Sequence, residues 1–523
     1  MDMFDYVIIG SGSAGCVLAA RLTEDPDVTV CLIEAGGSDR NLKVKVPAAF
    51  PQLFKSNRDW GYYSDPEPGL MGRRLFMPRG KMIGGSSSMN AMLYVRGNSA
   101  DYDGWAKDGA VGWSYDEVLP YFRSLENFSR GADDYRGADG PLHVTDHRSR
   151  TAMTQVILDA AVEAGIPFNE DYNGAHQEGV GYLQVTQKDG KRWSAADAWL
   201  RPALSRKNLT VRTGAQALGV IIEAGRATGV SVWTGNDSEV VRAEREVILS
   251  AGSIGTPQLL MLSGIGPADH LDAMDLEVIV DNPNVGAHLQ DHPLYLLNFE
   301  TTAKGTLAEA EHPKQLLNFF LRGRGLLTST VAEGTAFFSS REDLGAPDLQ
   351  LHFGAAYFHN HGFDTHDTPA YAIAPTLVAP QSRGHVRLRT ADPLVAPSIR
   401  GNHLTERADI KAMITGVERT RDIAAQAALR PVTGKEIHPG GAVVGAAAIE
   451  ADLRRDTELI YHPTSTARIG SPETGVVDSE LRVHGVVGLR VVDASVFPTI
   501  PRGNTNAATY MVAEKAADLI KGR

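Results

Sequence analysis

The sequence has few cysteines, no excess of basic residues and no long hydrophobic run. Cys16 and Cys31 are the only cysteines in 523 residues, so a disulfide framework is excluded and both are expected to be buried free thiols. Lys and Arg number 51 against 63 Asp and Glu, a net charge of −12, which argues against a nucleic-acid-binding surface. The longest apolar run, residues 440–449, is about half a membrane span.

The N-terminus also lacks the pattern of a secretory leader. The chain opens Met1-Asp2-Met3-Phe4-Asp5 and enters an apolar run at once, whereas a signal peptide needs a basic segment followed by a longer apolar one. We therefore expect a cytoplasmic protein without a transmembrane segment.

The length and composition predict a folded protein of more than one domain. At ~150 residues per domain, a chain of this length makes about three units or two large interleaved ones. Hydrophobic residues make up 43% and charged residues 22%, which is ordinary for a globular protein and excludes extended disorder.

The first 34 residues predict a dinucleotide-binding strand–helix–strand unit. An apolar strand at 6–9 leads into Gly10-x-Gly12-x-x-Gly15, followed by a helical pattern at 16–24 and a second strand at 28–33. In this pattern the glycines permit a tight turn, close approach of a pyrophosphate and close helix–strand packing. Glu34, 19 residues after Gly15, is placed to bind a ribose diol, which favours FAD or NAD over NADP.

The rest of the chain mixes strands and helices, which predicts an α/β fold. Strands are expected at 209–213, 217–223, 229–234, 247–250, 370–379, 385–389 and 489–492, the one at 385–389 antiparallel with one exposed face. A helix is expected from Thr256 with Pro257 at its first position, and another at 507–521.

Several segments resemble the signatures of the glucose–methanol–choline (GMC) oxidoreductases. Residues 80–97, which begin GKMIGGSSSMN, resemble the first family signature, and residues 252–266 resemble the second. Residues 462–470, HPTSTARIG, resemble the active-site segment, and residues 492–495 and 504–506 resemble the C-terminal flavin segment. Together with the N-terminal unit these segments span the chain in family order.

The resemblance implies an α/β (α+β overall) fold with two interleaved domains. A discontinuous Rossmann-like FAD-binding domain is expected at residues 1–155, 196–300 and 456–523. A substrate-binding domain, built on an antiparallel sheet flanked by helices, is expected at residues 156–195 and 301–455.

The resemblance also implies FAD as the cofactor, bound without a covalent bond. Some relatives attach the flavin to a histidine at the position of Met89, and a methionine cannot form that bond. The residues expected to contact FAD are Gly10, Gly12, Ser13, Ala14, Gly15, Glu34, Ala35, Gly84, Ser87, Asn90, Ala91, Met92, Ala217, Ala251, Gly252, Asp493, Ala494, Thr505 and Asn506.

The catalytic pair implied by the resemblance is His462 and Asn504. His462 would accept the hydroxyl proton of an alcohol as a general base while hydride passes to flavin N5, and Asn504 would hold the same oxygen by a hydrogen bond. The expected reaction is oxidation of a primary alcohol, aromatic or aliphatic, to the aldehyde. The helix at 507–521 would direct its N-terminus at the reduced flavin.

Tyr461, Ile460 and Glu333 are the residues predicted to line the substrate pocket, although Glu333 fits a solvated loop acid equally well. Relatives that are efficient oxidases carry a small residue two positions before the active-site histidine. Ile460 is bulky there, so we expect a slow or moderate oxidase, or a dehydrogenase with an acceptor other than O2. No dense aromatic cage for choline is evident.

Two other activities on the same scaffold stay open at this point. Relatives include hydroxynitrile lyases, which keep FAD without net oxidation, and fatty-acid photodecarboxylases. No metal is expected, because His352, His359, His361 and His366 match no strong ligand spacing. Residues 290–292, Gln-Asp-His, are expected to tie the domains together. The sequence does not predict the oligomeric state.

Overall fold

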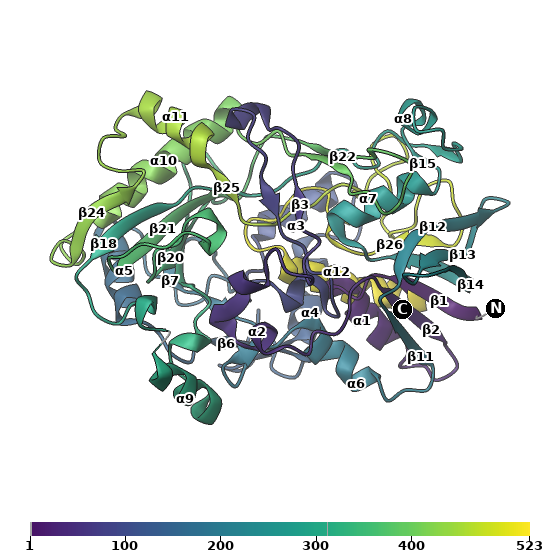
Figure 1. Ribbon diagram of the computed structural model, residues 1–523, viewed down its shortest axis with the longest axis horizontal. Coiled ribbons are helices and arrows are strands. Elements are labelled where there is room, and N and C mark those ends of the chain that lie inside the picture. Colours follow the sequence, from purple (N-terminus) through teal and green to yellow (C-terminus); the bar gives the residue numbers. More distant parts are fainter. Residues whose placement is uncertain (1–2, 311, 523) are drawn as a thin grey trace.

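Two large β-sheets, at opposite ends of the long axis, organise the protein (Figure 1). The computed structural model describes residues 3–310 and 312–522. Both termini lie at the end that holds the first sheet, and helices α10 (Arg407–Ala424) and α11 (Ala446–Asp456) lie at the other end (Figure 1). This α/β arrangement confirms the predicted fold class.

The first sheet has the strand order β11-β2-β1-β14-β13-β12, with β26 also paired to β14. Strands β1, β2, β11, β14 and β26 pair in parallel, while β12 and β13 add an antiparallel edge. Every residue of β2 is buried, as expected for a parallel strand covered on both faces. The strands are β1 (Met3–Ile9), β2 (Val30–Glu34), β11 (Leu209–Thr213), β12 (Gln216–Glu223), β13 (Arg226–Trp233), β14 (Ser238–Leu249) and β26 (Leu489–Val491).

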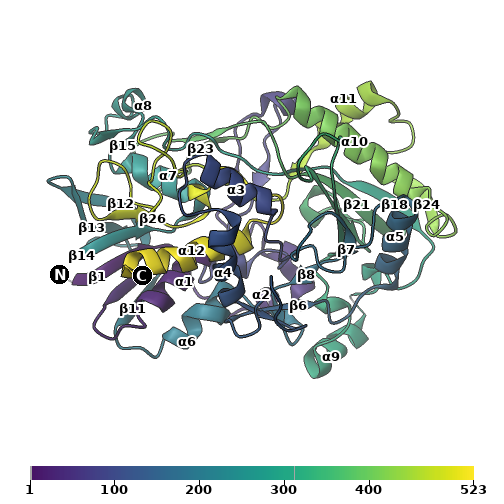
Figure 2. The same ribbon diagram turned by 180° about the vertical axis from the view of Figure 1, so that it is seen from behind.

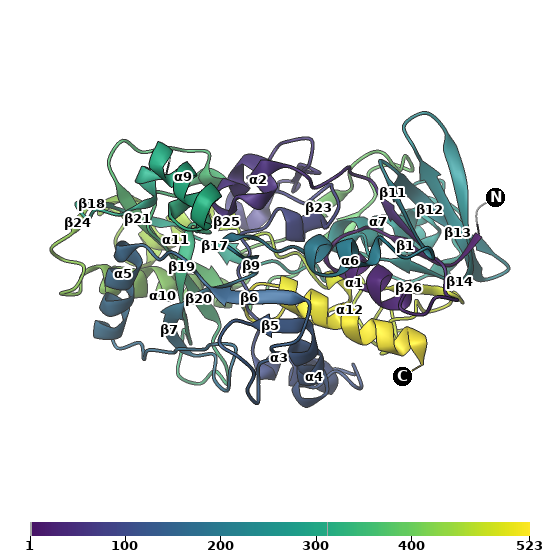
Figure 3. The same ribbon diagram turned by 90° about the horizontal axis from the view of Figure 1, so that it is seen from below.

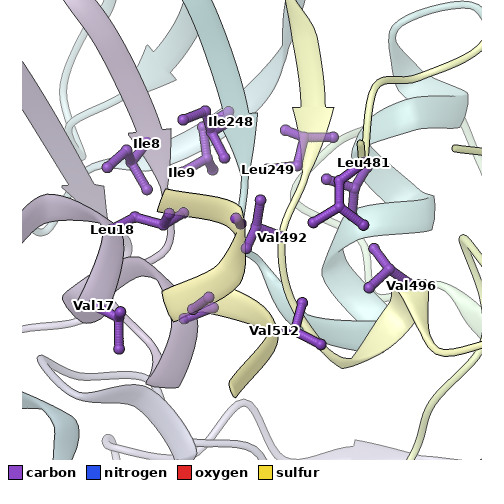
Figure 4. Packing of buried hydrophobic residues seen from close by; sticks show 14 of the residues in the cluster. Ile8, Ile9, Val17, Leu18, Ile248, Leu249, Leu481, Val492, Val496 and Val512 are labelled. Atoms are coloured by element: carbon purple, nitrogen blue, oxygen red, sulfur yellow. The ribbon is translucent and has the colours of Figure 1, made fainter. Parts of the chain in front are cut away.

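Helices α1 (Ser13–Leu22) and α12 (Asn506–Lys521) pack against each other beside this sheet (Figures 2 and 3). Figure 4 shows Ile8 of β1, Val17 of α1 and Val512 of α12 in one apolar cluster, and all three are fully buried. Burial of each such side chain stabilises the fold by roughly 1.5–3 kcal/mol. The C-terminal helix α12 therefore packs against the N-terminal strand–helix–strand unit.

The second sheet is antiparallel throughout and has the strand order β24-β18-β21-β20-β19-β7, with β17 and β25 at one side. Helices α5 (Ala152–Glu163) and α10 pack on it. The strands are β7 (Gly179–Tyr182), β17 (Pro293–Leu294), β18 (Leu297–Thr301), β19 (Ala332–Phe338), β20 (Leu349–Gly354), β21 (Ala370–Leu377), β24 (Thr433–His438) and β25 (Glu458–Leu459).

Three strands pair differently from what the expected domain boundaries imply. Strands β17, β18 and β25 pair inside the second sheet, whereas boundaries at 300 and 456 assign them to the FAD-binding domain. The chain therefore leaves the first unit before residue 293 and returns to it after residue 459. A strand pairs with whichever sheet lies beside it, and that neighbour is not encoded in its own local pattern.

Helix α7 (Gly252–Leu262) begins four residues before the expected start at Thr256 and contains Pro257 in its interior. The Asp493 carboxylate stabilises this earlier start, since Oδ2 accepts from the Gly252 N–H at 2.8 Å. A proline leaves the carbonyl four residues before it without its helical donor. Here Thr466 Oγ1 donates to the Ser253 carbonyl at 2.7 Å and replaces that donor.

Shorter elements connect the two units. Strand β22 pairs antiparallel with β23, which confirms the antiparallel strand predicted at 385–389. No helix among the described residues is long and apolar enough to cross a membrane. The shorter elements are α2 (Leu42–Lys45), α3 (Ser99–Lys107), α4 (Tyr115–Leu125), α6 (Arg201–Ala203), α8 (Ala268–Asp272), α9 (Pro313–Arg322), β3 (Tyr62–Tyr63), β4 (Phe76–Met77), β5 (Glu126–Phe128), β6 (Leu142–Asp146), β8 (Gln184–Val185), β9 (Gln187–Lys188), β10 (Lys191–Arg192), β15 (Ile265–Gly266), β16 (Val280–Asp281), β22 (His385–Arg387) and β23 (Ser398–Arg400).

Candidate active site

The glycines of the turn between β1 and α1 have two different steric environments. Gly10 has φ +99°, and a Cβ there would lie 2.5 Å from the Ser250 carbonyl oxygen; a Cβ on Gly15 would lie 1.9 Å from the Gly10 carbonyl oxygen. These two glycines are required by the fold. A Cβ on Gly12 would meet no protein atom closer than 4.0 Å, so at Gly12 the fold leaves space for a bound group beside the N-terminus of α1. A helix N-terminus favours phosphate.

Glu34 ends β2 beside this turn. Its Oε2 accepts hydrogen bonds from Ser11 N at 3.0 Å and Ser11 Oγ at 2.7 Å, and its Oε1 accepts from Gly36 N at 2.8 Å. Burial raises the pKa of this carboxyl group. Each carboxylate oxygen can accept more than one hydrogen bond, so these contacts leave acceptor capacity for a diol.

A single cavity of about 350 Å³ extends from this turn to His462 and Asn504. Three buried oxygens that belong to its lining residues, Ser250 Oγ, Ser253 Oγ and Asn504 Oδ1, have no hydrogen-bond partner among the described residues. The cavity thus offers polar atoms as well as space to a large polar cofactor. The predicted residues that line it are Gly10, Gly12, Ser13, Ala14, Glu34, Ala35, Asn90, Ala91, Met92, Ala217, Ala251, Gly252, Ile460, Tyr461, His462, Asp493, Ala494, Asn504, Thr505 and Asn506.

Gly15, Gly84 and Ser87 were also predicted to contact the cofactor, but they are not among the residues that line the cavity. The Gly84 N–H donates to the Ser11 carbonyl at 2.8 Å. Ser87 Oγ donates to the Gly84 carbonyl at 2.6 Å and accepts from Ala195 N at 3.0 Å. Gly84 and Ser87 therefore support the cavity wall through hydrogen bonds to other protein groups.

Glu333 lies in β19, fully buried, and does not line the cavity. Its Oε2 accepts from Thr151 N at 2.8 Å, Thr151 Oγ1 at 2.7 Å and Thr154 Oγ1 at 2.9 Å. This carboxylate therefore caps the N-terminus of α5. Both sequence-based interpretations of Glu333, a pocket residue and a solvated loop acid, were wrong.

His462 is held on three sides by polar groups. Its Nε2 lies 3.2 Å from Asn504 Nδ2, and its Nδ1 lies 3.0 Å from His292 Nδ1. Its backbone N–H donates to Asp291 Oδ1 at 2.6 Å. Because an amide nitrogen only donates, Nε2 of His462 acts as the acceptor and Nδ1 carries the hydrogen that faces His292. The lone pair of Nε2 thus points to the Asn504 side, where the cavity lies.

The electrostatic surroundings keep this histidine neutral. Burial, followed by the neighbouring His292 and the Arg79 guanidinium, lowers the pKa of His462 well below its ordinary value. Burial also lowers the pKa of His292 to about 3 and that of His352, another cavity residue, to about 4. At neutral pH His462 is consequently an unprotonated base.

Three residues near His462 were not predicted to belong to the site, namely Asp291, His292 and Arg79. Asp291 and His292 were expected to tie the domains together, whereas both contact His462 directly. Arg79 is half-buried in the cavity wall and donates to the Tyr461 carbonyl. No local pattern marks these residues, because His292 lies 170 positions from its partner in the sequence.

The part of the cavity near Tyr461 has aromatic walls. Trp60 and Tyr62 stack with ring centroids 5.8 Å apart, and Phe54 contacts Tyr461 edge to face at 5.5 Å. Most of these rings come from residues 41–75. The aromatic residues in the lining are Phe50, Phe54, Trp60, Tyr62, Phe358 and Tyr461.

Comparisons with known proteins agree with the motifs. Two family models, both described as GMC oxidoreductase, match residues 4–294 and 380–513. An uncharacterized GMC-type oxidoreductase of Mycobacterium tuberculosis is 45% identical over 99% of both chains, and mitochondrial choline dehydrogenase of Mus musculus is 42% identical over 100% of this chain and 90% of its own. The crystal structure of a pyridoxine 4-oxidase superposes with a TM-score of 0.92 at 31% identity, over 99% of each chain.

Proposed function

The chain belongs to the GMC oxidoreductases, and we propose that it is an FAD-dependent enzyme that oxidises an uncharged primary alcohol to the aldehyde. One observation carries the proposal: a neutral, oriented histidine, His462, lies with Asn504 in the same cavity as the Gly10–Ala14 turn. A proton acceptor and a dinucleotide site thus share one space.

The cofactor proposal rests on the fit of the cavity to FAD. The N-terminus of α1 and the space at Gly12 would hold the pyrophosphate, and Glu34 would hold the ribose. FAD, when bound, supplies the acceptor for the hydride and its two electrons. Met89 contributes to the cavity wall, and its thioether offers no group for a covalent flavin bond, which supports non-covalent binding.

The proton half of the reaction falls to His462. As the alcohol is oxidised its O–H bond breaks, the proton moves to Nε2 of His462, and the oxygen becomes the carbonyl oxygen of the aldehyde. Asn504 would donate a hydrogen bond from Nδ2 to the same oxygen and fix its position. His292 would then accept the hydrogen on Nδ1 of His462 and hold the charged ring in place.

The charge of the cavity favours an uncharged substrate. The charged side chains in the lining are Glu34 and Asp493, both assigned to the cofactor, and Arg79. Arg79 is close enough to lower the pKa of His462, so a cationic substrate would meet a like charge beside the base. The aromatic walls suit an alcohol with an aryl or alkyl group.

Choline is a second candidate on two specific grounds. The mouse relative that is 42% identical is named choline dehydrogenase, and aromatic rings attract quaternary ammonium groups. A panel of benzyl alcohol, butanol and choline, added to the yellow protein without oxygen, distinguishes an uncharged alcohol from choline as the substrate. Bleaching by the neutral alcohols at lower concentration than by choline supports our proposal, whereas bleaching by choline alone would favour the second candidate. Bleaching by none would favour a lyase or a photodecarboxylase.

Ile460 supports a proposal about the electron acceptor. This side chain lines the cavity and packs with Leu294, Leu296 and Ala374. A bulky residue two positions before His462 narrows access of O2, so we propose a slow oxidase or a dehydrogenase with another acceptor. Peroxide formed at the full rate of alcohol turnover in air would rule out the dehydrogenase.

A further inference from the structure

Three side chains of kinds that can bind a metal ion meet outside the cavity. The Nε2 atoms of His359 and His438 lie 2.9 Å and 2.5 Å from the same carboxylate oxygen, Oδ2 of Asp456. All three ligand atoms lie within 4.8 Å of one another. His438 ends β24, Asp456 ends α11, and both elements lie at the end of the molecule remote from the N-terminus (Figure 1). None of the three lines the candidate active site.

The opposite edge of each imidazole is fixed by an acceptor. His438 Nδ1 lies 2.6 Å from the Leu296 carbonyl oxygen, and His359 Nδ1 lies 2.9 Å from Asp364 Oδ2. Both partners only accept, so Nδ1 carries the hydrogen in both rings. With Nε2 deprotonated, each ring would direct its lone pair toward Asp456, where a cation would lie. Histidines that bind metals have this arrangement, with the far N–H on a carbonyl or carboxylate.

We propose that His359, His438 and Asp456 bind a divalent transition-metal ion, with Zn²⁺ as the best match. Two imidazoles and one carboxylate form a set that zinc accepts, with water as a fourth ligand. The cation would replace the contacts between the two Nε2 atoms and Asp456 Oδ2. The side chains of His359, His438 and Asp456 retain 20%, 19% and 25% of their exposure, so an ion can enter from solvent.

The charges around the site suit a dication. Asp364, Asp456 and Glu458 contribute three carboxylates, and the Arg73 guanidinium near Asp456 opposes them with one positive charge. The alternative to a metal is protonation of the rings. In that case each Nε2 carries a proton directed at Asp456 Oδ2, and a metal ion would displace it.

A metal here would stabilise the wall of the cavity. It would cross-link three segments, namely the loop that contains His359, strand β24 and helix α11. Phe358, next to His359, lines the cavity and is held by Asn298 through hydrogen bonds of 3.0 Å and 3.1 Å. The proposed role is structural, and it does not depend on the reaction assigned to His462.

The test is zinc stoichiometry by equilibrium dialysis of the chelator-treated full-length protein against ZnCl2, followed by elemental analysis. We expect one Zn²⁺ per chain in the wild type and in His366→Gln, a matched control in the same loop whose Nδ1 contacts Thr368. The triple variant His359→Gln, His438→Gln, Asp456→Asn should lose this zinc, and FAD content serves as its folding control.

A milder variant keeps the proposal testable if the triple variant does not fold. Asp364 is 42% exposed, and Asp364→Asn should weaken zinc binding by roughly 10–100-fold, as removal of such an outer partner does. Zinc should also raise the melting temperature of the wild type and of His366→Gln but not of the triple variant. Equal zinc content in the wild type and either the triple variant or Asp364→Asn at limiting zinc, or no bound zinc in the wild type, would overturn the proposal.

Discussion

His462 and His292 face each other through their Nδ1 atoms, which lie 3.0 Å apart with the ring planes at 89°. One of the two nitrogens must donate and the other accept. Asn504 settles which, because its amide nitrogen lies 3.2 Å from Nε2 of His462 and gives that nitrogen the acceptor role. The tautomer that a base requires is thus set by two partners from distant parts of the chain.

Replacement of Asn504 tests the positioning role directly. Asn504→Ala should slow flavin reduction by alcohol about 10–100-fold, because it removes one hydrogen bond worth roughly 1–3 kcal/mol to the substrate oxygen. Stopped-flow measurement of FAD-loaded protein reports this rate, with the surface variant Asn57→Ala as the control. A rate equal to that of the control would remove Asn504 from the mechanism.

The pH profile of flavin reduction should be flat through neutrality. A histidine of ordinary pKa, 6.5, would make the rate rise between pH 6 and 7. Burial and Arg79 lower the pKa of His462 well below that value, so it stays unprotonated there, and the rate should fall only in more acidic buffer. A midpoint near pH 6.5 would contradict the buried, neutral environment described for His462.

Stability should decrease in acid for the same reason. Burial lowers the pKa of His292 to about 3 and those of His352 and His361 to about 4. A lowered histidine pKa means that the unfolded chain binds more protons, so each such residue adds stability above pH 6.5 and loses it as the pH falls below that value. Each should contribute a slope of about 1.4 kcal/mol per pH unit.

Urea unfolding between pH 4.5 and 7.5 checks this sign. His352→Gln should reduce the slope relative to the wild type. A free energy of unfolding that rises as the pH falls from 6.5 would contradict the assignment.

FAD should leave the protein when it unfolds. Acid precipitation should transfer the yellow colour to the supernatant, because Met89 offers no covalent attachment. Glu34→Ala should weaken FAD retention by roughly 1–3 kcal/mol through loss of charge-assisted hydrogen bonds. Dialysis followed by flavin absorbance measures this, with the exposed Glu24→Ala as the control. Colour that stays with the precipitate would contradict non-covalent binding.

The sequence predicted the parts of the molecule that local chemistry determines. The Gly10–Gly15 turn, strands such as β11 and the C-terminal helix α12 follow from short-range patterns, because turn geometry and apolar periodicity are local. The start of α7 was misplaced, because Asp493, which determines it, is distant in sequence. The strands β17 and β25 were not predicted, because the strands that pair with them are distant in sequence.

The candidate site shows the same division. His462 and Asn504 lie in recognisable segments, and the structure brings them together. His292 could not be assigned in advance, because its role exists only through a contact across 170 residues. The convergence of His359, His438 and Asp456 was likewise not predicted, because the ligand spacing was judged only for the histidines between residues 352 and 366.

The most direct test of the central claim is stopped-flow reduction of FAD-loaded His462→Ala by an alcohol that bleaches the wild type without oxygen. The account predicts a rate lower by about 10²–10⁴-fold, the size of a lost general base, with FAD still bound. Matched FAD content in the two proteins separates loss of the base from loss of the cofactor. An unchanged rate in the fully loaded variant would contradict the account.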